Sequence, residues 1–286
     1  MLQRLLHSLK AQTLSPELFE VIVVNDGSRD DTGRICLGMK NEMANLRYLP
    51  TEENLGISIA RNRGIANAAG KYVLFTDDDC IAARNWVERM CAALDNEQIA
   101  AGAVASDPGA FLTLCHNIAQ FHPFLPGRPG GPIEFIAGAN LGVRRNVIAE
   151  LNGFREDMLL AGDMDLILRA RMKGYGAVFF PDAVVTHAPN RKTTSSLMEY
   201  AARHAAVTIV LRQEYSALLR TPGIFYSRAL LLSLAPLIAF KTTLGIYWGN
   251  RRLIRHIGTI PLVFALKLAW CRGAATGLAR HGRDTA

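Results

Sequence analysis

The sequence has few cysteines, and they form no pattern typical of a metal site or a disulfide framework. Its 286 residues contain five cysteines, an odd number, widely spaced and without a CxxC pair. This arrangement indicates neither a zinc site nor a small secreted scaffold held together by disulfide bonds. The first ten residues also lack the long apolar run of a secretory signal peptide. We therefore expect a reducing environment, with the folded part in the cytosol.

Acidic residues are scarce in the last third of the chain. Residues 191–286 contain 14 lysines and arginines but 3 aspartates and glutamates, a net charge of +11, which leaves −4 for residues 1–190. The basic part is also apolar and contains no recognised nucleic-acid-binding motif. This combination favours anionic lipid over nucleic acid as its partner. We expect a folded domain over residues 1–190 and a basic, apolar helical tail over residues 191–286, associated with a membrane surface.

Long apolar runs are missing from this tail. Its two most apolar stretches, residues 229–240 and 257–266, are shorter than the ~20 residues that a membrane span needs. A two-span hairpin entered from the cytosol would place a loop with three arginines, residues 250–256, on the far side, against the positive-inside tendency. We therefore expect helices that lie in the membrane plane or re-enter it. A two-span hairpin and an ordinary soluble helical subdomain are the alternatives.

Residues 1–190 show β-type runs that alternate with helical patterns. The β-type runs lie at residues 20–24, 46–49, 72–76, 135–143 and 177–180. The helical patterns lie at residues 2–12, 30–40, 58–69, 85–94 and 162–173. Such alternation predicts an α/β domain with a mainly parallel sheet flanked by helices on both faces. The Gly- and Pro-rich residues 106–132 are expected to form a long loop or lid.

Three consecutive aspartates, Asp77, Asp78 and Asp79, follow the apolar run at residues 72–76. Open α/β sheets bind ligands at the carboxyl ends of their strands, and oxygen-only side chains suit a hard divalent cation. The pattern therefore predicts a site for a metal-bound phosphate. The alternative is that the aspartates cap the helix that follows, although one carboxylate would suffice for that.

Other polar residues near predicted strand or helix ends have ordinary structural explanations when each is taken alone. The stretch Asn25-Asp26-Gly27-Ser28 has the composition of a turn. Arg61 would lie on a solvated helix face, Asp163 would be a helix N-cap, and His187 would be a structural histidine at the end of a strand.

Taken together and in order, these motifs resemble glycosyltransferase family 2, on the nucleotide-sugar-binding fold known as GT-A. The segments that carry the resemblance are VVNDGS at residues 23–28, NLG at 54–56, ARN at 60–62, FTDDD at 75–79, GAN at 138–140, GDMDL at 162–166 with Arg169, and PDAVVTH at 181–187. The resemblance covers about residues 1–190. It implies an inverting transferase that uses Mn²⁺ or Mg²⁺ and a nucleotide-diphospho-sugar donor, with UDP as the expected nucleotide.

The resemblance also implies which residues hold the metal. Asp79 corresponds to the direct ligand of the Asp-x-Asp pair. Asp77, a second candidate ligand, and Asp78 would hold the ribose, metal-bound water or the sugar. Some family members use a histidine at the position of His187 as a further ligand, and here the ligand and structural roles of His187 are equally open.

The remaining roles concern the donor and the acceptor. By resemblance, Asp26 reads the base of the nucleotide, and Arg61 pairs with the donor diphosphate or holds Asp79 in place. Asp163 is the expected base that takes the proton of the acceptor hydroxyl, with Gly162 at the position where the family often has glutamate. Asp165 and Arg169, one helical turn apart, are expected to form a supporting ion pair.

One departure concerns the N-terminal end. Family members normally have one more strand before the helix expected at residues 2–12, so we expect either a true start upstream of Met1 or a domain without that strand. A catalytically weak membrane scaffold is therefore one alternative function. A sugar-phosphate nucleotidyltransferase is another, although its Gly-rich, Arg- and Lys-containing N-terminal loop is absent here. The basic tail would place the enzyme at the cytoplasmic face of the cell membrane, which suits a lipid-linked or polysaccharide acceptor.

Overall fold

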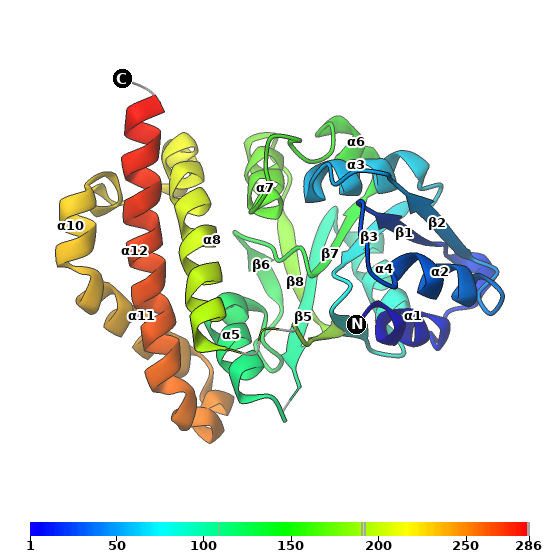
Figure 1. Ribbon diagram of the computed structural model, residues 1–286, viewed down its shortest axis with the longest axis horizontal. Coiled ribbons are helices and arrows are strands. Elements are labelled where there is room, and N and C mark those ends of the chain that lie inside the picture. Colours follow the sequence, from blue (N-terminus) through cyan, green and yellow to red (C-terminus); the bar gives the residue numbers. More distant parts are fainter. Residues whose placement is uncertain (108, 190, 192, 285–286) are drawn as a thin grey trace. The chain divides into compact units, whose positions relative to one another are not determined.

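A computed structural model describes residues 1–107, 109–189, 191 and 193–284, with side chains up to residue 281. The chain forms two compact units (Figure 1). The first unit comprises Met1–Ala105 and Pro129–Pro189. The second unit comprises the described residues of 106–128 and 190–286. The second unit therefore takes up a segment from the middle of the sequence as well as the tail.

The first unit contains two sheets. In the smaller sheet, β1 (Val21–Asn25) pairs in parallel with β2 (Leu46–Pro50). The larger sheet has the strand order β3-β7-β5-β8-β4, and β6 pairs with β8. Its strands are β3 (Tyr72–Thr76), β4 (Cys80–Ala82), β5 (Ile99–Ser106), β6 (Gly131–Ile133), β7 (Asn140–Arg144) and β8 (Ala177–His187). Because β7 runs antiparallel to both of its neighbours, β3 and β5, the larger sheet is mixed rather than purely parallel.

Helices accompany these sheets, which confirms the expected α/β class. They are α1 (Leu2–Lys10), α2 (Thr32–Lys40), α3 (Ile57–Asn67), α4 (Trp86–Asn96), α6 (Arg145–Glu150) and α7 (Gly162–Met172), with a short 3₁₀ turn η1 (Pro16–Leu18). The helix expected at residues 85–94 is confirmed as α4, and its residues Trp86, Val87, Met90 and Leu94 are all buried. Their apolar side chains lie on one face of the helix, and burial of that face stabilises the packing of α4.

A buried asparagine ties the centre of the larger sheet together. Asn140, at the start of β7, is fully buried. Its Nδ2 donates to the carbonyl oxygens of Ala103 on β5 and Ala183 on β8, both at 2.9 Å, and its Oδ1 accepts from Trp86 Nε1 at 2.8 Å. A Cβ atom on Gly102 would lie 2.3 Å from Asn140 Nδ2, so glycine is required at this crossing. The amide thus fixes three strands and a helix close to the loop that carries the aspartates.

The described residues of the second unit form helices and their connections. The helices are α5 (Phe111–Phe121), α8 (Thr194–Glu214), α9 (Ser216–Leu219), α10 (Arg228–Ser233), α11 (Ala235–Gly249) and α12 (Ile260–Asp284). The 3₁₀ segments are η2 (His122–Phe124), η3 (Gly223–Tyr226) and η4 (Arg251–Thr259). Cys115 and Ile118 of α5 share a core with Tyr247, Leu253 and Val263.

Three sequence expectations are wrong in detail. The long loop expected at residues 106–132 contains α5, whose apolar positions pack in the core of the second unit although glycine and proline dominate its flanks. The strand expected at residues 135–143 begins only at Asn140. The strand expected to stop before Pro181 continues to His187, because Pro181 lies between the part of β8 that pairs with β6 and the part that pairs with β4.

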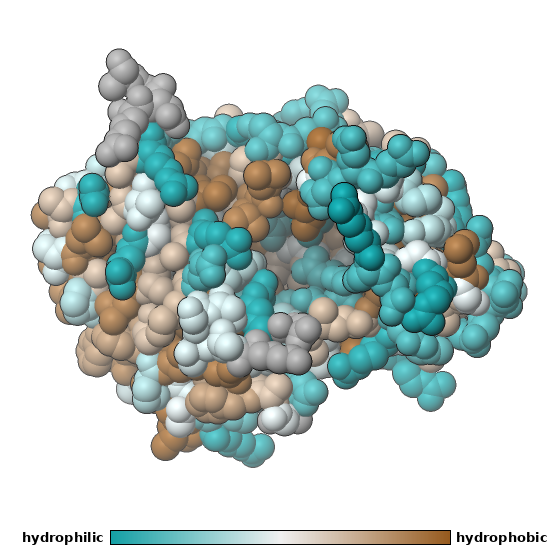
Figure 2. Space-filling view, viewed as in Figure 1, coloured by the Kyte–Doolittle hydropathy of each residue, from teal (hydrophilic) through white to brown (hydrophobic). Residues whose placement is uncertain are grey.

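The tail contains one stretch that passes a length and composition test for a membrane span. Among the residues that the structure describes, Arg251–His281 alone is long and apolar enough. Core helices of soluble proteins can have the same length and composition. Brown and tan hydrophobic residues also gather over α10 and α11 (Figure 2).

Candidate functional site

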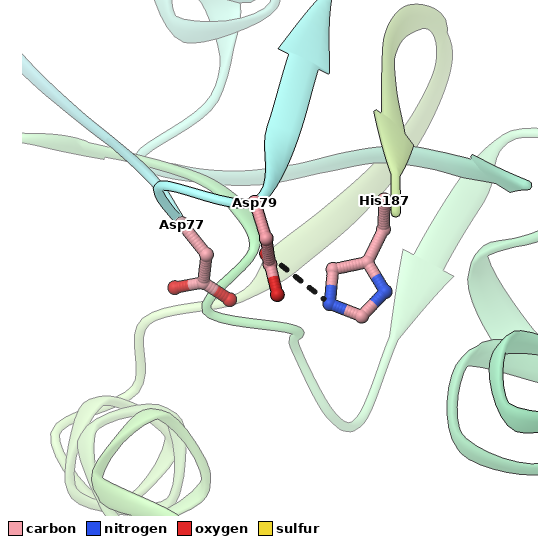
Figure 3. Close-up of side chains that lie close together, drawn as sticks. All are labelled: Asp77, Asp79 and His187. Carbon is pink, nitrogen blue, oxygen red and sulfur yellow. Dashed lines mark ion pairs between the residues drawn. The ribbon is translucent and has the colours of Figure 1, made fainter. Parts of the chain in front are cut away.

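Two aspartates and a histidine converge at the edge of the larger sheet. Asp77 and Asp79 lie in the short connection between β3 and β4, and His187 is the last residue of β8 (Figure 3). The register of β4 against β8 places Cys80 opposite His187, which brings the histidine next to Asp79. Asp79 Oδ1 and His187 Nε2 are 3.4 Å apart. One ligand atom from each of Asp77, Asp79 and His187 lies within 4.8 Å of the others. We call these three residues the acid–histidine cluster.

The chemistry of the acid–histidine cluster fits a divalent cation. Metal–ligand distances of about 2.0–2.6 Å are usual for cations such as Mg²⁺, Mn²⁺ and Ca²⁺. Two ligand atoms that share one such cation therefore lie roughly 3–5 Å from one another. Carboxylate oxygens suit Mg²⁺ and Mn²⁺, and an imidazole nitrogen shifts the preference toward a transition metal such as Mn²⁺. His187 is 4% exposed, so the fold has already desolvated this nitrogen. Of the sequence-predicted residues, the structure thus brings Asp77, Asp79 and His187 together.

Arg61 lies beside this cluster. Its Nη2 is 3.4 Å from Asp77 Oδ1, and its guanidinium lies 5.2 Å from the centre of the Phe154 ring. Phe154 in turn packs edge-on against Phe75 of β3. Burial raises the pKa of Asp77, the Arg61 guanidinium opposes this shift, and the charges of Asp163 and Asp78 add to it. The site therefore concentrates negative charge that positive groups must balance.

Asp163 borders the same space from α7. Its Oδ2 accepts from the backbone N–H of Gly138 at 2.7 Å, and its Oδ1 accepts from the backbone N–H of Met164 at 2.9 Å. A Cβ atom on Gly138 would lie 2.8 Å from Arg61 Nη2 and 3.3 Å from Asp163 Oδ2. Gly138 thus lets its segment approach both side chains. An anionic side chain is also favourable in the first turn of a helix.

Asp26 and Asp78 lie outside the acid–histidine cluster. The two carboxylate oxygens of Asp26 accept from the backbone N–H groups of Leu55 and Gly56, each at 2.8 Å. Gly56 precedes α3 with a φ of +102°, a conformation that favours glycine. Asp26 therefore holds the start of the helix that carries Arg61, and its reading of the base stays a prediction. Asp78 is exposed, and its donor role also stays a prediction.

The sequence reasoning gave no role to Asn62, the neighbour of Arg61. Its Nδ2 donates to the carbonyl oxygen of Phe154, and its Oδ1 accepts from the N–H of Phe154, both at 2.8 Å. Ser58, one turn earlier on α3, donates to the carbonyl oxygen of Met158 at 2.7 Å. These bonds fasten α3 to the segment that leads into α7. The only sequence signal was the presence of Asn62 in the ARN motif.

The ion pair predicted for Asp165 and Arg169 is confirmed. Arg169 Nε and Asp165 Oδ2 are 2.7 Å apart, and Asp165 is fully buried. Arg155 approaches the other carboxylate oxygen at 3.4 Å. Arg169 also donates to the carbonyl oxygens of Leu151 and Gly153. The pair and these hydrogen bonds therefore hold α7, whose first turn carries Asp163, against residues 151–155.

Two family models match the chain. "Glycosyl transferase family 2" matches residues 1–151, and "Glycosyl transferase family group 2" matches residues 107–272. Among curated relatives, glycosyltransferase AglE of Haloferax volcanii is 27% identical over 65% of this chain and 62% of its own length. The N-acetylglucosaminyl-diphospho-decaprenol L-rhamnosyltransferase of Mycobacterium tuberculosis is 27% identical over 77% of this chain and 83% of its own. The match to the probable glycosyltransferase YdaM of Bacillus subtilis spans 42% of that protein.

Solved structures share the fold. The mannosyltransferase PcManGT of Pyrobaculum calidifontis, in complex with GDP-Man and Mn²⁺, is 18% identical, with a TM-score of 0.62 over 93% of this chain and 81% of its own. TarS of S. aureus, residues 1–349 with UDP-GlcNAc, is 17% identical, with a TM-score of 0.55 over 99% of this chain and 88% of its own. These likenesses show a fold of the GT-A type. With a family model that covers more than half of its residues, the chain belongs to glycosyl transferase family 2.

Proposed function

We propose that the protein is an inverting, divalent-metal-dependent glycosyltransferase. It moves a sugar from a nucleotide-diphospho-sugar to a hydroxyl group of a lipid-linked or polysaccharide acceptor. The observation that carries this proposal is the convergence of Asp77, Asp79 and His187, whose potential ligand atoms lie within 4.8 Å of one another beside Arg61. Two carboxylates, an imidazole and a guanidinium suit a metal-bound diphosphate.

In this reaction the acceptor oxygen forms a bond to the anomeric carbon while the bond to the donor diphosphate breaks, and the electron pair leaves with the diphosphate. Asp163 takes the proton of the acceptor hydroxyl, held in place by the N–H groups of Gly138 and Met164. Arg61, whose Nη2 is 3.4 Å from Asp77 Oδ1, would balance negative charge on the departing group. A divalent cation held by Asp79, Asp77 and His187 would neutralise charge on the same group.

For the donor we propose a UDP-sugar bound to Mn²⁺ or Mg²⁺. The complex of TarS with UDP-GlcNAc supports a uridine nucleotide, and the Mn²⁺ complex of PcManGT supports a divalent metal. PcManGT carries GDP-Man, so the nucleotide needs a direct test. Thermal unfolding with a panel of UDP- and GDP-sugars in Mn²⁺ provides it, because a ligand of the folded form raises the unfolding temperature. Stabilisation by GDP-sugars alone would reject the uridine assignment.

For the acceptor we propose a lipid-linked or glycan hydroxyl at the cytoplasmic face of the cell membrane. The Mycobacterium tuberculosis relative is named for a diphospho-decaprenol acceptor. The tail of this chain is basic and apolar, as a membrane-associated segment would be.

The decisive experiment measures sugar release from UDP-sugars by the purified protein with Mn²⁺. We expect turnover in the natural protein, a loss of most turnover in Asp79→Asn and in Asp163→Asn, and no change in Asp182→Asn, an exposed aspartate of β8. Asp163→Asn should still bind the donor, because its expected role begins with the acceptor. Equal turnover in all four proteins would reject the assignment of the site. No turnover in the natural protein would favour the inactive scaffold.

A further inference from the structure

Helix α11 exposes a continuous apolar stripe. Leu237, Phe240, Leu244 and Trp248 are 62%, 59%, 53% and 85% exposed. Their spacing of three or four residues places them on one face of the helix. The opposite face, with Ala239, Thr243, Ile246 and Tyr247, is buried in the second unit. The helix therefore has a core-facing side and an apolar side that the described residues leave uncovered.

Neighbouring segments extend this surface. Leu230 of α10 is 51% exposed, and Ile254 and Ile257 of η4 are each 62% exposed. Exposed cationic side chains accompany them, namely Arg228, Lys241, Arg251, Arg252 and Arg255. Residues 215–283 contain ten lysines and arginines and no aspartate or glutamate. We call the exposed apolar and basic residues of α10, α11 and η4 the basic apolar surface.

This composition identifies the occupant of the surface as anionic lipid. Large exposed apolar patches mark binding surfaces, and arginine or lysine beside them matches the phosphate groups of a bilayer. A second copy of the chain would bring the same positive charges together, and those charges would repel one another. An interfacial tryptophan, here Trp248 at the end of α11, is typical of a helix at the boundary between lipid and water.

The length of α11 indicates how it meets the bilayer. Its 15 residues extend about 22 Å at the rise of an α-helix. The hydrocarbon core of a bilayer is roughly 30 Å thick, so α11 is too short to cross it. An amphipathic helix of this kind lies in the plane of the interface, with its apolar side toward the acyl chains.

The packing of α12 indicates that it does not cross either. Helices α8 and α12 run side by side (Figure 1), and Gly273 and Gly277 of α12 face the backbone of α8. A Cβ atom on Gly273 would lie 2.1 Å from the carbonyl oxygen of Ala202, and one on Gly277 would lie 2.3 Å from that of Ala206. Helix α8 carries exposed Glu199, Arg203 and Glu214. A bilayer-spanning α12 would draw these charges into hydrocarbon or lose its closest contact.

We propose that the second unit is attached to one leaflet of an anionic membrane by the basic apolar surface of α10, α11 and η4, while α8 and α12 stay outside the hydrocarbon core. This chooses in-plane attachment over the two-span hairpin. The inference deepens the proposed membrane association and does not depend on glycosyl transfer. Sugar release from a soluble donor, measured on the same samples, separates a failure of attachment from a failure of catalysis.

The attachment is tested by flotation of the full-length protein with vesicles. The vesicles contain phosphatidylcholine alone or equal parts phosphatidylcholine and phosphatidylglycerol. The natural protein should float with the anionic vesicles, and Leu237→Glu with Leu244→Glu should weaken binding by about ten-fold or more. Leu37→Glu, at a leucine of α2 that is 59% exposed, is the matched control and should bind as the natural protein does. Equal flotation of both variants would overturn the proposal.

A second variant tests the electrostatic contribution to vesicle binding. It introduces no glutamate into the apolar stripe, so it remains informative if the Leu→Glu changes disturb folding. Arg251→Gln with Arg255→Gln keeps every apolar side chain, so it should weaken binding to the anionic vesicles and leave the weak binding to neutral vesicles unchanged. Binding of this variant to anionic vesicles at the natural level would contradict the assignment of anionic lipid as the partner.

Topology is tested by labelling with a membrane-impermeant maleimide. Inside-out vesicles from an expressing bacterial host carry Arg255→Cys in η4, Arg280→Cys near the end of α12, or Asp182→Cys in the first unit. All three positions are exposed in the structure. We expect all three cysteines to react before detergent is added. Protection of position 255 until detergent would show the two-span hairpin, and protection of position 280 would show a single span by α12. Either result, with position 182 reactive throughout, would overturn the proposal.

Discussion

At the residue scale, the aspartates between β3 and β4 repel one another, and the fold supplies positive charge beside them. Burial and the neighbouring carboxylates raise the pKa of Asp77, while Arg61 lowers it. Arg61 can act there because Asn62 and Ser58 fasten α3 to residues 153–158. The position of the guanidinium thus depends on uncharged side chains that take no part in the proposed reaction.

Asn62→Ala tests this dependence. The change leaves the N–H and the carbonyl oxygen of Phe154 without their amide partner, so it should lower the free energy of unfolding by about 1–3 kcal/mol. Asn67→Ala is the matched control, because Asn67 is a half-buried amide of the same helix whose side-chain hydrogen bonds, to the carbonyl oxygen of Arg63 and from Arg47 Nη2, are exposed to solvent. Urea denaturation measures both variants. A loss for Asn67→Ala as large as that for Asn62→Ala would contradict the assigned role.

Gly138→Ala separates the site from the fold. The new methyl group would meet the guanidinium of Arg61 at 2.8 Å, and a flexible side chain can move away from it. The unfolding temperature should therefore change little, while donor turnover should fall by about ten- to a hundred-fold as Arg61 is displaced. Gly64→Ala serves as control, since its Cβ would have ordinary contact with Val24 at 3.5 Å. Turnover that survives Gly138→Ala unchanged would show that the guanidinium position does not matter.

At the element scale, sequence patterns predicted the strands and helices whose apolar period was clear. The strand at residues 72–76 has the predicted bounds, and α4 covers most of the helix predicted at residues 85–94. Helix α5 was missed because glycine and proline surround it, and β5, with the sequence IAAGAVAS, was missed because small residues carry little strand propensity. Both segments are defined by tertiary burial, which a local pattern does not contain.

The contact of α8 with α12 gives a prediction at this scale. Gly277→Ala would place a methyl group 2.3 Å from the carbonyl oxygen of Ala206, and backbone cannot give way as a side chain does. We expect Gly277→Ala to lower the free energy of unfolding by roughly 1–3 kcal/mol. Thermal unfolding measures this loss. Gly245→Ala, on α11, meets nothing within 4 Å and should be neutral or stabilising by up to about 1 kcal/mol. Equal unfolding temperatures of the two variants would argue against close packing at Gly277.

At the scale of the whole molecule, the two units have different compositions and different proposed partners. The first holds the acidic site, whereas the second has a large excess of lysine and arginine over aspartate and glutamate and holds the exposed apolar helices. The charge division was visible in the sequence, and so was the family resemblance that linked Asp79 to Asp163 and His187. The inclusion of residues 106–128 in the second unit was not visible, because it rests on long-range contacts such as Lys267 donating to the carbonyl oxygen of Ala119.

The most direct test of the central claim is a titration of the protein with Mn²⁺ in the absence of donor. Thermal unfolding and electron paramagnetic resonance monitor the binding, so the test does not depend on turnover. A cation held by Asp77, Asp79 and His187 should stabilise the protein by about 2.7 kcal/mol at a free concentration of 100 Kd. Asp79→Asn and His187→Ala should weaken this binding by about ten-fold or more, because each removes one ligand. Asp182→Asn should bind Mn²⁺ as the natural protein does. Mn²⁺ binding of equal strength in Asp79→Asn, His187→Ala and the natural protein would contradict the account.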